Sequence, residues 1–252
     1  NNVDHCTRLC HASSVAALLQ SVGSAAVTAP FTAAKDAECI IVIGARPEQN
    51  HPVAASYLKQ AVKNGSKLII IDPRKQNLSR YATHHLQFNP GQDLSLLNAM
   101  IYTIIEEGLI NKDYIKNNTE GFELLEKEIK GFAPLLMEKL CGIKAEVIKE
   151  VARLYAKSKT SIIFWGMGIS QHVHGTQNAF CLINLALITG QVGRDGTGLH
   201  PLRGQNNVQG ASDAGLIPMS YPDYQRVSIN KNQSEMESFW NVTLDPNEGK
   251  TV

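Results

Sequence analysis

Three short, uninterrupted apolar runs constrain the fold of this chain most strongly. They are residues 39–43 (CIIVI), 68–71 (LIII) and 161–165 (SIIFW). A strand that is apolar on both faces is typical of a parallel strand buried between two helix layers. An amphipathic helix is expected over 52–63 between the first two runs, which makes a right-handed βαβ unit. The sequence therefore predicts an α/β fold: an open, mainly parallel sheet with helices on both faces, in a Rossmann-like three-layer arrangement.

The remaining chain is expected to supply further helices and one short strand. The first helix is expected to use Ser13 or Ser14 as its N-cap. From about residue 220 the chain turns polar and aromatic, and we expect it to be extended or to pack against parts of the protein outside this sequence. The other predictions are a strand at 84–88, helices at 94–105, within 109–159 and at 176–188, and irregular chain from 190 to 198.

Composition excludes several classes of protein. The 252 residues are 43% hydrophobic and 19% charged, which fits a soluble globular core. The net charge of +1 gives no bulk field for nucleic acid or an anionic membrane, and no apolar run approaches the ~20 residues of a membrane helix. Because the sequence begins without an initiator Met or a signal peptide, we expect an internal fragment of a longer, cytoplasmic protein whose targeting signals lie elsewhere.

The cysteines favour buried thiols over a disulfide framework. Five is an odd number in a chain large enough to form a core, and Cys39, Cys141 and Cys181 lie in apolar segments. The other two form a C-x3-C pair at Cys6 and Cys10.

Cys10 stands directly beside His11, before the expected helix start. The partial positive charge of a helix N-terminus would shift this thiol toward thiolate, the form that binds metals. A buried thiol beside a solvated imidazole is the plainer interpretation. A zinc site made of His5, Cys6, Cys10 and His11 also stays open, although no second pair at zinc spacing follows.

The loops after the predicted strands favour a polar, anionic ligand. Glycines allow close backbone approach and offer N–H groups to phosphate, aspartate accepts from ribose or base, and arginine can bind phosphate bidentately. Glycines also end strands in any α/β protein, but the loops together favour a nucleotide-like ligand. Neither G-x-G-x-x-G nor G-x-x-x-x-G-K-[ST] occurs, which argues against an ordinary NAD or ATP site. The loops are residues 44–50, 72–74, 91–93 and 166–171.

Two polar segments carry a specific resemblance. Residues 6–11 (CTRLCH), with 14–16 (SVA), resemble the metal-ligand segment of formate dehydrogenase catalytic subunits in the molybdopterin oxidoreductase family. Residues 201–210 (PLRGQNNVQG) resemble the second active-site segment of that family. The resemblance also takes in 72–75 (DPRK), 165–168 (WGMG) and 189–190 (TG), and so covers nearly the whole chain.

The resemblance implies a site and a cofactor. Cys10 would ligate molybdenum or tungsten, His11 would handle a proton near the metal, and Arg203 would contact the substrate carboxylate. The strand-end loops would hold one of two guanine-dinucleotide pterins, together bis-MGD. The cofactor-binding residues expected on this basis are Gly44, Arg46, Gln49, Asp72, Arg74, Gly91, Asp93, Gly166, Met167, Gly168, Gln171 and Gln205.

The resemblance also implies an organisation and an activity. Residues 1–205 would be an α/β bis-MGD-binding domain carrying the metal-ligand cysteine, and 206–252 the truncated start of a second cofactor-binding domain. The parent would oxidise formate to carbon dioxide and pass electrons to a 4Fe-4S cluster outside this sequence and to partner electron-transfer subunits. The isolated fragment, which lacks the other domains, is expected to be inactive.

Three other functions remain open at this point. One is a pterin-free electron-transfer scaffold similar to the large iron–sulfur subunit of NADH:quinone oxidoreductase, although Cys10, His11 and Arg203 argue against it. The second is another member of the family, such as a nitrate reductase. The third is a plain nucleotide-binding module; calorimetry with GMP, GDP and NAD would separate it, since only guanine binding fits the pterin interpretation.

Overall fold

The computed structural model describes residues 2–251, and the chain forms two compact units. The larger is Ser13–Leu202, and the smaller combines Asn1–Ala12 with Arg203–Val252. This division rests on contacts within the chain, so it does not test whether residues 206–252 begin a second cofactor-binding domain. That assignment stays a prediction.

The larger unit is built on a five-stranded sheet in which every pairing is parallel, in the order β3-β2-β1-β4-β5. This confirms the predicted fold class. The three apolar runs form the centre of the sheet, and every residue of β1 and β4 is buried. The strands are β1 (Cys39–Ile43), β2 (Lys67–Ile71), β3 (His84–Leu86), β4 (Ser161–Trp165) and β5 (Gly198–Pro201).

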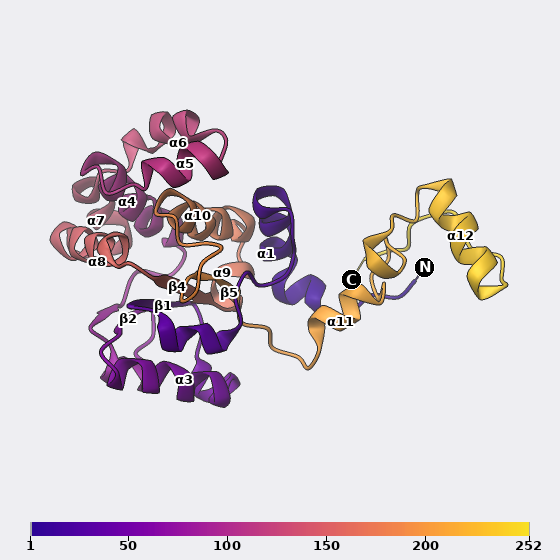
Figure 1. Ribbon diagram of the computed structural model, residues 1–252, viewed down its shortest axis with the longest axis horizontal. Helices are drawn as coiled ribbons and strands as arrows, with labels where there is room; N and C mark the ends of the chain where they lie inside the picture. The colour runs from indigo at the N-terminus through magenta and orange to yellow at the C-terminus, as the bar shows by residue number, and fades with distance from the viewer. Residues whose placement is uncertain (1, 252) are drawn as a thin grey trace. The chain divides into compact units, whose positions relative to one another are not determined.

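Helices cover both faces of the sheet, as Figure 1 shows. Alternate strand residues face opposite layers, since side chains point to opposite faces with period two. Ile41, Ile69 and Ile163 join the core formed with α4, α8 and α10, whereas Ile40, Ile70 and Ile162 pack toward α3. The helices of this unit are α2 (Pro47–Asn50), α3 (Pro52–Lys63), α4 (Asp93–Glu106), α5 (Lys112–Asn118), α6 (Phe122–Glu128), α7 (Pro134–Cys141), α8 (Ala145–Lys157), α9 (Met167–Ser170) and α10 (Gly175–Ile188). Short 3-10 turns lie at Phe31–Asp36, Asn77–Tyr81 and Ile129–Gly131.

The direction in which successive strands are added to the sheet reverses between β1 and β4. From β1 the chain runs outward through β2 to β3, whereas β4 and β5 lie on its other side. Ile43 pairs with both Ile71 and Trp165, so the three strands end level with one another. The loops that follow them therefore lie together at one edge, where ligands bind in open α/β sheets.

The sequence pattern predicts no strand at the position of β5. Gly198, His200 and Pro201 disfavour a strand, but β5 lies at an edge of the sheet, where proline is tolerated. The chain before β1 covers it: Thr28 N donates to Leu199 O at 3.0 Å, and Leu199 N donates to Thr28 Oγ1 at 2.8 Å. These contacts come from distant sequence, which explains why local pattern missed the strand.

Helix α1 (Thr7–Val22) begins earlier than predicted, so neither Ser13 nor Ser14 is its N-cap. Its backbone departs from helical geometry at His11, with φ −137° and ψ 20°. Both serine hydroxyls are instead bonded to Ser170. The N-cap prediction is wrong because tertiary contacts take the hydroxyls.

The smaller unit holds α11 (Val208–Asp213), a 3-10 turn at Pro222–Tyr224 and α12 (Asn230–Trp240). Helix α12 lies where extended chain was expected. It has no buried residue, and its contact with the rest of the unit includes an edge-to-face pair of the Trp240 and Tyr221 rings, with centroids 6.1 Å apart. Its weak periodicity reflects this limited burial.

Candidate functional site

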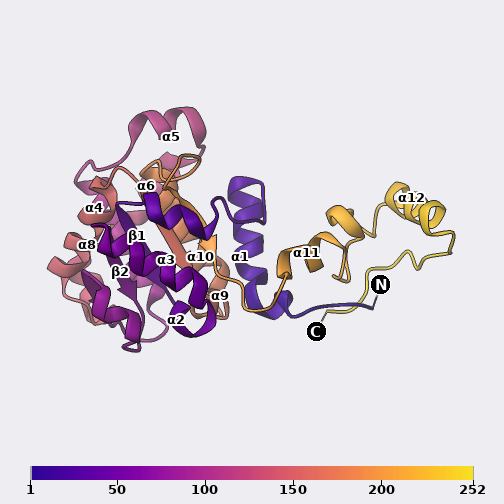
Figure 2. The same cartoon turned by 60° about the horizontal axis from the view of Figure 1, so that its bottom comes forward.

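The loops after β1 and β4 cross at close backbone range, at the end of the sheet where α2 and α9 lie (Figure 2). Gly168 N donates to Gly44 O at 3.0 Å. A Cβ on Gly44 would lie 2.8 Å from the carbonyl carbon of Gly168, and one on Gly168 would lie 2.6 Å from the Cα of Gly44. Glycine is required at both positions by this crossing.

The same crossing corrects the expectation that these glycines offer their N–H groups to phosphate. Gly44 N donates to Ile71 O at 3.1 Å, and Gly166 N donates to Ile43 O at 3.2 Å. With Gly168 N also bonded, all three amides are used inside the fold. Any ligand contact by these residues has to come from the close approach that glycine allows.

Asp72, at the end of β2, is a buried carboxylate held on both oxygens. Oδ1 accepts from Arg74 N at 2.8 Å, and Oδ2 accepts from Gln76 Nε2 at 3.1 Å. Gln76 Nε2 also lies 3.0 Å from Ala45 O, so it joins the loops after β1 and β2. Sequence reasoning missed Gln76, because its role depends on the neighbouring loop and no motif marks it.

Basic groups surround Asp72. Burial raises the pKa of its carboxyl above the ordinary value, while the Arg74 N–H and the charges of His85, Arg46 and Arg74 oppose that rise. Arg46 is half-buried and Arg74 is exposed. The buried His85 Nε2 has no hydrogen-bond partner. This cluster combines one fixed acceptor with several cations, as a nucleotide's base and phosphates require.

The other predicted loop residues divide into exposed and buried positions. Gln49, Met167 and Gln171 are exposed around α2 and α9. Gly91 is also exposed, and its φ of +80° is a turn conformation that glycine adopts without strain. The fifth, Asp93, is 3% exposed at the start of α4; burial raises the pKa of its carboxyl, and the charge of His172 opposes this.

In the smaller unit, Cys10 and Arg203 lie close together although they are far apart in sequence. Cys10 is 2% exposed, and its sulfur accepts a hydrogen bond from the Gly204 backbone N–H. Burial lowers the pKa of the Arg203 guanidinium, and the nearby Cys10 and Tyr224 raise it. A Cβ on Gly204 would lie 4.0 Å from the Cys10 sulfur.

The expectation of an activated thiolate is wrong for this chain on its own. Burial raises the pKa of Cys10, and Cys6 raises it further, while the Gly204 N–H and Arg203 lower it. The helix begins at Thr7, so Cys10 lies at the end of its first turn, and its N–H already donates to Cys6 O at 2.9 Å. The expected solvated imidazole is also wrong, because His11 is fully buried.

The zinc alternative is excluded by geometry. Within residues 2–251, no group of three or more His, Cys, Asp or Glu side chains is arranged to hold a metal ion. The His5 ring points elsewhere: its Nε2 lies 3.3 Å from Ser212 Oγ. Any metal at Cys10 would therefore take its remaining ligands from a cofactor or from other parts of the protein.

The segment after Arg203 owes part of its composition to local structure. Asn207 adopts a left-handed backbone with φ 51°, caps α11, and accepts from Gly210 N at 3.2 Å. A Cβ on Gly210 would lie 2.5 Å from the Asn207 side chain. Gln205, by contrast, is exposed. In the same segment Asn206 is also exposed, and Arg203 is half-buried.

Sequence reasoning also passed over Arg8. Its Nε lies 3.1 Å from an Asp4 carboxylate oxygen, and its Nη2 lies 2.9 Å from the Met219 sulfur. The C-x3-C spacing marks Cys6 and Cys10 on either side of Arg8, but no motif marks Arg8 itself. Arg8 ties the start of α1 to the chain after α11.

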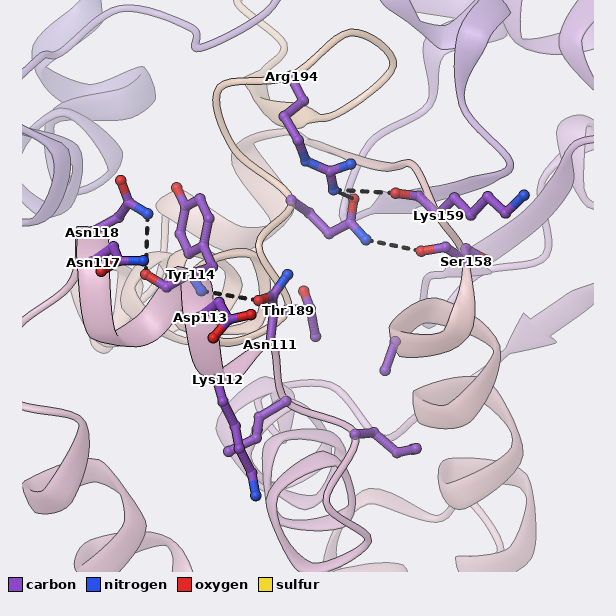
Figure 3. A pocket seen from close by; sticks show the side chains of 14 residues that line it. Asn111, Lys112, Asp113, Tyr114, Asn117, Asn118, Ser158, Lys159, Thr189 and Arg194 are labelled. Carbon is purple, nitrogen blue, oxygen red and sulfur yellow. Dashed lines mark hydrogen bonds between the residues drawn. The ribbon is translucent and has the colours of Figure 1, made fainter.

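A polar groove lies at the opposite, amino edge of the sheet (Figure 3). Arg194 donates to Gly190 O at 2.9 Å and to Lys159 O at 3.1 Å, and Gln191 Nε2 donates to Ser158 O at 3.0 Å. These bonds join the end of α8 to the loop after α10. These hydrogen bonds therefore stabilise the amino edge of the sheet. None of the predicted site residues lines the groove.

Comparisons with known proteins give the family of this chain. The family model described as molybdopterin oxidoreductase matches residues 1–251. The F420-dependent formate dehydrogenase subunit alpha of Methanocaldococcus jannaschii is 42% identical over all of this chain and 37% of its own length. Formate dehydrogenase H of Escherichia coli is 40% identical over 98% of this chain and 34% of its own length.

A nitrate reductase of Synechocystis is less similar, at 33% identity over 96% of this chain. Among solved structures, acetylene hydratase of Pelobacter acetylenicus superposes with a TM-score of 0.64 and 26% identity, over 74% of this chain and 25% of its own. The chain thus spans about a third of the length of these relatives. With a family match along essentially its whole length, the chain belongs to the molybdopterin oxidoreductase family.

Proposed function

We propose that the parent protein is a formate dehydrogenase catalytic subunit and that this chain supplies its metal-ligand cysteine and substrate arginine. The observation that carries the proposal is the buried Cys10 thiol beside the Gly204 N–H and the Arg203 side chain. The two relatives of 40% identity or more described above are named formate dehydrogenases. The nitrate reductase alternative has less support, because that relative is only 33% identical.

The residues present fit a molybdenum or tungsten bis-MGD cofactor. Cysteine sulfur is a soft ligand suited to such a metal. A single protein ligand fits a centre whose other ligands come from the pterins, and no three-residue metal cluster competes for the ion within the described chain. When bound, the cofactor accepts the two electrons of formate oxidation. The raised pKa of Cys10 is the value without metal, which itself favours the thiolate.

Arg203 orients the substrate in this proposal. A guanidinium presents a planar fork that matches a carboxylate bidentately, so it can hold both formate oxygens and fix the direction of the C–H bond. Because Arg203 is partly desolvated, its charge acts through a medium of low dielectric and attracts an anion more strongly than an exposed arginine.

His11 receives or passes the proton released when formate is oxidised. Imidazole changes charge near neutral pH, which suits general acid–base work. Its full burial, next in sequence to the metal ligand, keeps it from bulk water. The non-helical backbone at His11 gives its side chain a direction that a regular helix would not.

The strand-end loops bind one guanine dinucleotide in this proposal. Asp72 supplies a fixed acceptor for base or ribose, and Arg46 and Arg74 supply phosphate contacts. Because the glycines at the crossing have no side chains, a ligand can approach the backbone of the loops after β1 and β4 closely. Gln49, Gly91, Asp93, Met167, Gln171 and Gln205 are proposed to complete the contacts.

The wider assembly follows from the same proposal. The parent carries a 4Fe-4S cluster outside this chain and passes electrons to partner subunits in the cytoplasm. Within residues 2–251, no helix is both long and apolar enough to cross a membrane.

The test is metal analysis with formate-dependent dye reduction on the full-length parent, comparing wild type, Cys10→Ala and Cys6→Ala. Cys6 is a matched control, since it is an exposed thiol four residues earlier. Cys10→Ala is expected to lose at least ~10-fold in bound metal and in turnover, because it removes a ligand, whereas Cys6→Ala keeps both. Retained metal with undiminished formate turnover in Cys10→Ala would contradict the proposal.

A further inference from the structure

A buried hydrogen-bond network in the larger unit joins helix α1 to the loop after β4. Trp165 Nε1 donates to Ser14 Oγ at 2.8 Å, and that hydroxyl shares a second bond of 2.7 Å with Ser170 Oγ. Ser13 Oγ donates to the backbone oxygen of Ser170 at 2.7 Å. Ser14 and Trp165 are 0% exposed and Ser170 is 6% exposed, so water does not compete for these bonds.

The network ends on residues that border the proposed cofactor loop. Trp165 is the last residue of β4, which is paired on both sides by β1 and β5 and is therefore held firmly. Ser170 closes α9, the short helix that begins with Met167 and Gly168. Ser14 comes four residues after Cys10 in the same helix, just beyond the break at His11.

The packing around the network leaves little freedom. A Cβ on Gly175 would lie 2.0 Å from Ser170 O and 2.9 Å from Ser13 Oγ, so only glycine fits beside them. Apolar side chains could also hold a helix against this loop. Hydrogen bonds with fixed partners instead select one arrangement, because shifting the helix would leave buried donors unpaired.

We propose that Ser14 is a positioning residue for the reaction: its hydroxyl holds the part of α1 from Ser13 onward against residues 166–170 and so keeps the proposed cofactor loop in one arrangement. This inference rests on the proposed function. Loss of the hydroxyl would remove the acceptor of Trp165 and the partner of Ser170. The cofactor would then be held less firmly and turnover would fall, although neither partner touches formate.

The experiment compares Ser14→Ala with Ser161→Ala in the full-length parent. Ser161 is a matched control: it is also 0% exposed, its Oγ donates to Tyr155 O at 3.2 Å, and it begins β4 at the far end of the strand. The readouts are metal per chain, guanine nucleotide released from the cofactor per chain, kcat and KM for formate, and Tm.

Both variants are expected to lower Tm, since each removes a buried hydrogen bond. Only Ser14→Ala should lower metal and guanine content several-fold and kcat by on the order of 10-fold, the size of effect seen when an outer-shell partner of a metal site is removed. If Ser14→Ala and Ser161→Ala have equal cofactor content and equal kcat, the inference is overturned.

A milder variant covers the case in which Ser14→Ala does not fold. Ser170→Ala removes one hydroxyl but leaves the bond from Trp165 to Ser14 and the bond from Ser13 to the backbone of residue 170. It should show the same selective loss, and full cofactor content with wild-type kcat would reject the inference.

Wild type and Cys10→Ala are measured alongside. If the wild-type parent holds no metal, the proposed function itself is contradicted. A loaded wild type, a metal-poor Cys10→Ala and fully loaded serine variants would reject only the role of Ser14.

Discussion

At the scale of single residues, the proposed site contains groups whose neighbours change their chemistry. Arg203 is partly buried near the Cys10 thiol and the Tyr224 hydroxyl. Asp93 is a carboxyl whose burial disfavours its charge. Each therefore leads to a prediction that would not hold for an exposed residue of the same type.

Arg203→Lys in the full-length parent should reduce kcat/KM for formate by roughly 100-fold, because an ammonium keeps the charge but cannot hold both carboxylate oxygens. Steady-state kinetics with a dye acceptor measures this. Arg153→Lys is the control, since that arginine makes an exposed bidentate pair with Glu107 and should leave kcat/KM unchanged. Equal kinetics for both variants would argue against a substrate contact by Arg203.

Asp93 makes stability depend on pH in a defined direction. Its folded pKa is raised, so the folded state binds more protons than the unfolded state between the two pKa values. Its contribution is therefore present at low pH and is lost as the pH rises through the folded pKa. Urea unfolding from pH 4 to 7.5 should show wild type losing stability relative to Asp93→Asn as the pH rises, and a constant difference would contradict this.

At the scale of elements, the sheet was predictable and the contacts that complete it were not. Strands β1, β2 and β4 follow from continuous apolar runs, because burial on both faces leaves a local record in sequence. Strand β5 left no such record, because its stability comes from Thr28 and from an edge position. The start of α1 was misplaced for the same reason: the contacts of Ser13 and Ser14 are tertiary.

The crossing of the loops after β1 and β4 can be tested by adding one methyl group. Gly44→Ala should lower the unfolding free energy by about 2–5 kcal/mol, since it combines left-handed strain with a clash against Gly168. Gly108→Ala has a similar φ of +65° with open space around it, and should lose only about 1–2 kcal/mol. Urea unfolding followed by circular dichroism compares them; equal losses would mean that the crossing tolerates a side chain.

At the scale of the whole molecule, our proposal makes the chain one part of a larger site. It spans 37% of the length of one formate dehydrogenase subunit and 34% of another. The pairing of Cys10 with Arg203 could be anticipated only through the resemblance of their two segments, because no local pattern links positions so far apart. The roles of Gln76, Ser14 and Trp165 could not be anticipated at all, since each depends on a distant partner.

The isolated 252-residue chain is expected to retain neither metal nor bis-MGD through gel filtration and to oxidise no formate. In our proposal this chain supplies one protein ligand, Cys10, and one set of strand-end loops, which are too few contacts for a cofactor of two pterins. Metal analysis of the purified chain, after reconstitution with cofactor released from an active formate dehydrogenase, measures this. Stoichiometric molybdenum or tungsten on the chain would contradict it.

The most direct test of the central claim is X-ray absorption at the metal edge of the full-length parent, comparing wild type, Cys10→Ser and Cys6→Ser. If Cys10 is the protein ligand, Cys10→Ser should lose one sulfur from the metal's coordination shell while Cys6→Ser matches wild type. A sulfur shell that is the same in all three proteins would contradict the account.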